Sequence, residues 1–158
     1  MMDMFFFVKA VHILSSTILF GFGAGTAWYF WNAHLTGDPV VIARVGKMVV
    51  KADWIFTGGS GVVQPLSGLM LLHLEGISMS ASWLVVAFGL YILAFACWLP
   101  VVGLQIRAQR LAQTAMETSA PLCELYFRTM RVWFFLGWPA FFALICVFWL
   151  MVSKPNLW

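Results

Sequence analysis

Four long runs of apolar residues dominate the chain, and shorter polar stretches separate them. The runs cover roughly residues 5–31, 54–74, 81–106 and 132–152. Each run exceeds the roughly 18 residues that mark a candidate membrane span, whereas the strands of a membrane barrel read as alternating segments of about 10 residues. We therefore predict an all-α fold, a four-helix transmembrane bundle that forms a single domain over residues 1–158.

The basic residues predict how this bundle lies in the membrane. The connection after the second run, residues 75–80, has no Lys or Arg. The two other connections contain Arg44, Lys47, Lys51, Arg107, Arg110, Arg128 and Arg131. Because cytoplasmic loops of membrane proteins carry the excess of Lys and Arg, both termini are predicted to face outward from a bacterial inner membrane, an N-out/C-out topology.

Three further expectations concern the first connection. Residues 40–51, which carry three cations among apolar residues, are expected to form either an interfacial helix or a solvated helical connector. His34 is expected to be solvated. Asp53 is expected to cap the second spanning helix, since a carboxylate suits the positive end of the helix dipole.

Composition excludes several classes of protein. The chain is 63% hydrophobic and only 9% charged, whereas soluble domains are about 25% charged. The net charge of +3 comes without a basic cluster on one face, so we expect no nucleic-acid partner. The three cysteines form no CxxC pattern, which argues against a zinc site and covalently attached haem. No acidic residue is expected inside a span, which disfavours transport.

The clearest polar residue in a span is His12, because ionisable side chains are costly in a membrane and mark functional sites by default. Lys9 and Ser16 lie one turn before and after it, on the same helix face. His73 lies near the outer end of the second helix, with Met70 one turn earlier. Antiparallel helices bring the outer ends of the first two spans together, so His12 and His73 are predicted to share a site.

Two histidines on facing helices of a bundle can bind a haem iron from both sides. We therefore predict a b-type haem with His12 and His73 as ligands, and Lys9 beside an anionic haem propionate or snorkelling to the surface. Copper is the alternative metal, because Met70 and the N-terminal methionines are soft ligands. The alternative without a cofactor is that both histidines make interhelical hydrogen bonds. Gln64 is not expected to share the face of His73.

The resemblance to a known family rests on five sequence segments. They are VKAVHILSS at 8–16, ADWIFT at 52–57, QPLSG at 64–68, CWLPVVGLQIR at 97–107 and GWPAF at 137–141. Together they resemble the bacterial membrane family called domain of unknown function 2269, over almost the whole chain. This resemblance implies an integral membrane protein and brings no activity with it.

The pattern Lys-Ala-x-His-Ile at residues 9–13 is also similar to the first helix of the HemJ-type protoporphyrinogen oxidases and of the copper-resistance D membrane proteins. In the HemJ type the histidine of this helix is implicated in haem binding, which would correspond to His12. The leading hypothesis is therefore a haem protein of electron transfer or haem-linked oxidation, with a periplasmic cytochrome or the quinone pool as redox partner. The alternatives are a non-catalytic subunit or assembly factor of a larger membrane complex, and copper handling. Pairing of two copies through Gly21 and Gly25 is a further possibility.

Overall fold

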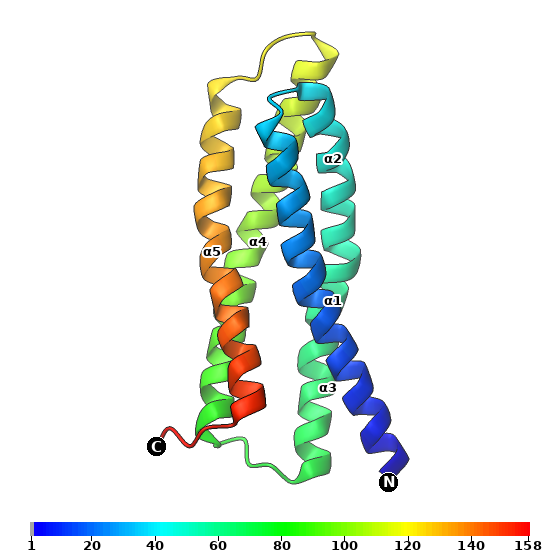
Figure 1. The fold of residues 1–158 in the computed structure, drawn as a ribbon, viewed down its shortest axis with the longest axis vertical. Coiled ribbons are helices and arrows are strands. Elements are labelled where there is room, and N and C mark those ends of the chain that lie inside the picture. The colour runs from blue at the N-terminus through cyan, green and yellow to red at the C-terminus, as the bar shows by residue number, and fades with distance from the viewer. Residues whose placement is uncertain (1) are drawn as a thin grey trace.

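The computed structural model describes residues 2–158 and consists of four helical rods that lie side by side (Figure 1). The helices are α1 (Met2–Leu35), α2 (Pro39–Ala52), the π-helix η1 (Asp53–Gly58), α3 (Gly59–Glu75), α4 (Ser82–Glu117) and α5 (Glu124–Ser153). Because α2, η1 and α3 follow one another without a break, they form one rod. All four rods are long and apolar enough to cross a membrane, and residues 2–158 contain no strand. The predicted all-α four-helix bundle is thus confirmed.

Both chain termini lie at one end of the bundle (Figure 1). We call this the terminal end; it also holds the connection 76–81. The opposite end holds the connections 36–38 and 118–123 and most of the Lys and Arg residues, and we call it the basic end.

The helices continue past the predicted apolar runs toward the basic end. α4 has 36 residues, which corresponds to about 54 Å, whereas the hydrocarbon core of a bilayer is about 30 Å thick. Its apolar run ends near residue 106, but Ala108, Ala112 and Ala115 continue a buried face at helical spacing. The apolar run therefore marks the part of α4 that is apolar on all sides and can face lipid. The helix extends beyond this run because one narrow apolar face continues and packs on protein.

The same reason explains α2, which extends the second rod at the basic end. Ile42, Ala43 and Val49 are buried, while Arg44 and Lys47 are exposed. The buried face packs against α1 and α4. Of the two forms expected for residues 40–51, the structure thus shows a helical connector, which continues directly into η1 and α3 and packs one face on protein.

Asp53 does not cap a helix, in contrast to the prediction. The cap is Asp38, whose carboxylate accepts a hydrogen bond of 2.8 Å from the Val40 backbone N–H, and Pro39 follows at the first helical position. Asp53 instead lies inside the continuous rod and only 3% of it is exposed. The helix continues through Asp53 because α2, which precedes it, is already packed against α1 and α4.

The side chain of His34 contacts the side chains of other residues, whereas the sequence predicts a solvated residue. Its Nδ1 lies 3.0 Å from the hydroxyl of Tyr126, which is completely buried. The ring also packs against Trp31 and Phe127. Since α1 continues to Leu35, His34 is part of a helix that packs against α5 and not of a free loop.

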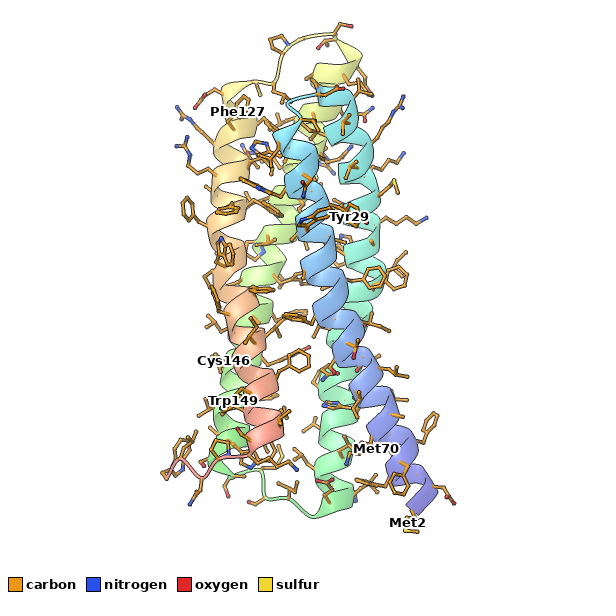
Figure 2. All side chains as sticks on the ribbon, in the orientation of Figure 1. Met2, Tyr29, Met70, Phe127, Cys146 and Trp149 are labelled. Atoms are coloured by element: carbon orange, nitrogen blue, oxygen red, sulfur yellow. The ribbon has the colours of Figure 1, made fainter. Side chains whose placement is uncertain are left out.

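The best-packed part of the molecule is its basic half. The core there joins α1, α2, α4 and α5 and includes Phe30, Ile42, Ala108, Ala112, Tyr126, Met130 and Trp133. Toward the terminal end α3 stays against α1 while α4 stays against α5, and close backbone contacts between these two pairs are few (Figure 1). The outer surface carries exposed apolar side chains such as Tyr29 and Trp149, which suits contact with lipid (Figure 2).

Candidate functional site

A cavity of about 550 Å³ separates the two helix pairs in the terminal half of the bundle. We call it the His12 cavity. All four rods contribute to its wall, with His12 and Ser16 from α1, Gln64 from α3, Tyr91 from α4 and Phe148 from α5. Most of the remaining wall is apolar. A mainly apolar cavity with a few polar groups is the usual form of a small-molecule site, and its volume lies in the usual range of about 300–1,000 Å³.

Both ring nitrogens of His12 have partners on α3. Nδ1 lies 2.9 Å from Ser67 Oγ, and Nε2 lies 3.2 Å from Gln64 Nε2. Ser15, one turn along α1, donates to Gln64 Oε1. These contacts come from the segments 8–16 and 64–68, so the polar face of α1 meets the polar face of α3.

One arrangement of these hydrogen bonds leaves Nε2 of His12 unprotonated. When Ser67 donates its hydroxyl proton to the Val63 carbonyl, at 2.7 Å, Oγ accepts from an N–H at Nδ1. Nε2 is then the unprotonated nitrogen and accepts from the Gln64 amide. Histidine binds metals as a neutral imidazole, through the nitrogen that carries no proton.

Gly68 explains how α1 and α3 come close enough for these contacts. A Cβ atom at this position would lie 3.2 Å from His12 Cε1 and 3.7 Å from Nδ1. Such a distance is tighter than an ordinary contact, so a side chain here would push the imidazole away from Ser67. The glycine therefore keeps the ring in its position.

Charged side chains stand at the terminal mouth of the His12 cavity. Lys154 Nζ lies 3.8 Å from the Glu75 carboxylate and 5.6 Å from the centre of the Trp83 ring. Lys9 lines the same cavity from α1 and lies 5.2 Å from the centre of the Phe5 ring. The cavity thus has an apolar interior and a charged mouth, which suits an amphiphilic molecule with an anionic group.

The structure places three of the five predicted cofactor residues in this cavity. His12, Lys9 and Ser16 line it, whereas His73 and Met70 do not. His73 is exposed near the end of α3, and Met70 is 40% exposed. The partner of His12 on α3 is the Gln64–Ser67 segment, and Gln64 does not share the face of His73, as expected. Residues 2–158 contain no group of three or more His, Cys, Asp or Glu side chains arranged to hold a metal ion.

A second cavity, of about 430 Å³, lies toward the basic end between α1, η1, α4 and α5. We call it the Asp53 cavity. Its wall is rich in aromatic rings, with Trp31, Trp98, Trp133, Phe134, Trp138 and Phe141 among them. Leu19, Phe20, Tyr91 and Leu144 line both cavities, so the two adjoin one another inside the bundle.

A buried polar network stands in the wall of the Asp53 cavity. Asp53 Oδ1 accepts from the hydroxyl groups of Thr26 at 2.7 Å and Thr57 at 3.1 Å. Asp53 Oδ2 accepts from Gln105 Nε2 at 2.6 Å, and Gln105 Oε1 accepts from Trp133 Nε1 at 3.1 Å. The exposed fraction of each of the five residues is at most 7%. The network joins all four rods.

Sequence reasoning missed this network, and the statement that no acidic residue lies inside a span is wrong. Asp53 and Gln105 each stand at the edge of an apolar run, where a polar residue reads as a boundary. The sequence does contain a signal for this network. Four of its members lie near those ends of the apolar runs that point toward the basic end: Thr26, Asp53, Gln105 and Trp133. Antiparallel helices bring such positions to the same level.

The four rods, their apolar outer surface and the two internal cavities define a multi-pass integral membrane protein. The chain belongs to the family described as predicted integral membrane protein (DUF2269), whose match covers residues 6–155 and confirms the family resemblance. No match was found among curated proteins or among solved structures. The similarity of residues 9–13 to the HemJ-type and copper-resistance D proteins stays a prediction.

Proposed function

We propose that this protein binds a b-type haem in the His12 cavity and serves in electron transfer or haem-linked oxidation within the membrane. The observation that carries the proposal is the state of His12. The ring lines a mainly apolar cavity of about 550 Å³, and in the tautomer with the proton on Nδ1, which is bonded to Ser67, Nε2 is an unprotonated nitrogen.

The residues of the cavity fit a haem in chemistry. A neutral imidazole is a usual haem ligand, and a hydrogen bond to its other nitrogen orients the ring and raises its basicity. Gln64 occupies the lone pair of Nε2 with a neutral hydrogen bond of 3.2 Å, which a ligand can replace. Lys9 at the mouth suits an anionic propionate of a haem, whereas Lys154 is paired with Glu75, and the apolar wall suits the macrocycle.

The geometry favours His12 as the single protein ligand. The earlier expectation of two histidine ligands pairs it with His73, which is exposed and does not line the cavity. His12 on α1 would hold the haem, and α4 and α5 would supply apolar wall for its macrocycle. When bound, haem iron supplies one-electron redox chemistry, and a periplasmic cytochrome or a membrane quinone is the expected redox partner.

The test is the absorption spectrum of detergent-purified protein from haem-replete cells, air-oxidised and then reduced with dithionite. Wild type, His12→Ala and the matched control His73→Ala are compared at equal protein concentration. We expect a Soret band and a reduced α-band in wild type, loss of both in His12→Ala, and retention in His73→Ala. A wild-type spectrum without a Soret band contradicts the proposal.

The same preparation separates the alternatives that the sequence leaves open. Copper handling requires stoichiometric copper by metal analysis without a Soret band. A non-catalytic subunit or assembly factor requires a stoichiometric partner in mild detergent without a cofactor. A homo-oligomer would show as a multiple of the 17.8 kDa chain mass, and Gly21 and Gly25 are available for it because neither packs within the chain.

We also propose that the protein resides in a bacterial inner membrane with its basic end in the cytoplasm. The support is the distribution of Lys and Arg, since the connection 76–81 at the terminal end has none. A reporter that is active only outside the cytoplasm, fused after Trp158, tests this orientation. Activity of the reporter is expected, and its absence contradicts the N-out/C-out topology.

A further inference from the structure

We propose that Asp53 is a proton-binding site inside the bundle, at which the carboxyl group takes one proton from water on Oδ1 while the Thr26 hydroxyl turns from Oδ1 to the Phe22 carbonyl. The ligand of this site is the proton itself. The proposal is independent of haem, because it concerns a different cavity and different residues.

Trp133 and Gln105 fix which oxygen of Asp53 can carry the proton. An indole N–H can only donate, so Trp133 must face the carbonyl oxygen Oε1 of Gln105. This contact turns the amide nitrogen of Gln105 toward Asp53 Oδ2, at 2.6 Å. Oδ2 therefore always accepts a hydrogen bond, and a proton added to the carboxyl group has its place on Oδ1.

The Thr26 hydroxyl can form a hydrogen bond with Oδ1 both when Oδ1 is unprotonated and when it carries the proton. Its oxygen lies 2.7 Å from Asp53 Oδ1 and 2.7 Å from the Phe22 carbonyl oxygen. Because a hydroxyl has one proton, it donates to only one of them at a time. When Asp53 is a carboxylate, Thr26 donates to Oδ1. When Oδ1 carries a proton, Oδ1 donates to Thr26 and Thr26 donates to Phe22, so every hydrogen bond is kept without moving a heavy atom.

The surroundings of Asp53 provide no fixed positive charge. Neither ion pair found within residues 2–158 includes Asp53. Among the titratable side chains of the neighbouring elements, four are exposed: Tyr29, Lys51, Arg107 and Arg131. Tyr91 donates to the Gly61 carbonyl, Cys97 is half-buried, and His12, His34 and Tyr126 contact other polar side chains. A buried carboxylate without a counter-ion is costly, and ionisable residues inside membrane bundles mark proton relays and ligand sites.

The local helix geometry points to the same position. η1 begins at Asp53 and is a π-helix of six residues, and π-helical turns within α-helices are frequent at functional sites. Asp53, Thr26 and Thr57 all line the Asp53 cavity, so the carboxyl group stands beside a space inside the bundle and not within solid packing. That space adjoins the His12 cavity at Tyr91.

The test is an infrared difference titration of the full chain in detergent, from alkaline to acid pH. A buried carboxylic acid gives a carbonyl band at higher wavenumber than solvated acids do. We expect one such band that appears reversibly on acidification, disappears completely in Asp53→Asn, and remains in Asp38→Asn, which changes the exposed helix cap. A titration in which wild type and Asp53→Asn show the same bands overturns the proposal.

A second pair of variants tests the hydroxyl even if Asp53→Asn fails to fold. Thr26→Val removes the hydroxyl that we assign as the acceptor of the proton on Oδ1, so the carbonyl band should move to higher wavenumber. Thr26→Ser keeps the hydroxyl and should keep the band of wild type. An unmoved band in Thr26→Val overturns the proposed turn of the Thr26 hydroxyl. A missing Soret band leaves this titration unaffected, so the two proposals fail separately.

Discussion

Trp133 orients Gln105 across the interface between α5 and α4. The indole N–H donates to the amide oxygen at 3.1 Å, and the amide nitrogen then donates to Asp53 on the second rod. One donor-only side chain thereby determines how a buried amide and a buried carboxyl group meet. This chain of hydrogen bonds connects three of the four rods at a single level of the bundle.

Removal of Trp133 or of Gln105 from this chain should destabilise the protein to different degrees. Trp133→Phe leaves the buried Gln105 Oε1 without its donor, for which we expect a loss of about 1–2 kcal/mol in the free energy of unfolding. Gln105→Leu leaves both Asp53 Oδ2 and Trp133 Nε1 without a partner, for which we expect about 2–4 kcal/mol. Thermal unfolding in detergent, followed by circular dichroism, measures both. Trp149→Phe, at an exposed position, is the control and should resemble wild type.

The close packing of α2 depends on Gly46. A Cβ atom here would lie 3.0 Å from Gln109 Cγ and 3.0 Å from Phe30 Cε2, and Phe30 is completely buried. We expect Gly46→Val to lower the free energy of unfolding by about 1–3 kcal/mol, because the ring cannot move without disturbing the core. Gly59→Ala is the matched control, since nothing lies near its Cβ position. Equal unfolding temperatures for Gly46→Val and wild type would contradict the packing described for α2.

The contact between His34 and Tyr126 should stabilise the basic end. Tyr126→Phe keeps the buried ring but removes the hydroxyl that lies 3.0 Å from His34 Nδ1. We expect a loss of about 0.5–1.5 kcal/mol in the free energy of unfolding, the usual contribution of a neutral hydrogen bond. Tyr29→Phe removes a hydroxyl from an exposed position and should have no measurable effect. A solvated His34 would make the two variants indistinguishable.

Ser67 should control haem affinity without touching the haem. Ser67→Ala removes the acceptor of the His12 Nδ1–H, and loss of such a second partner typically weakens metal binding by about 10–100-fold. Haem affinity is measured by transfer of haem to an apo-globin, followed by absorption. Ser153→Ala, whose hydroxyl bonds only within α5, is the control and should transfer haem at the rate of wild type. If both variants behave alike, Ser67 has no part in positioning His12.

The sequence predicts the number of spanning helices well, because long apolar runs report contact with lipid directly. It predicts their ends poorly, because the helices continue wherever a narrow apolar face packs on protein, as Ala108 and Ala112 do on α4. It also mistakes Asp53 for a helix boundary. A polar residue at the edge of an apolar run reads as the end of the span, and only the packing of four helices shows that Thr26, Thr57 and Gln105 surround it.

At the candidate site, Lys9, His12 and Ser16 line one cavity, as three residues on one helix face can, because three and four residues separate them. The partner on α3 could not be predicted from the ends of the runs alone. Gly68 leaves room for the His12 ring against α3, and His12 lies beside Gln64 and Ser67 instead of His73.

The most direct test of the central claim is a titration of haem-free purified protein with haemin, followed at the Soret band in detergent. If the His12 cavity is a haem site, the absorbance should saturate at one haem per chain in wild type and in His73→Ala, with no saturable change in His12→Ala. A linear increase without saturation in wild type, equal to that of His12→Ala, would contradict the account and return His12 to a role in helix packing.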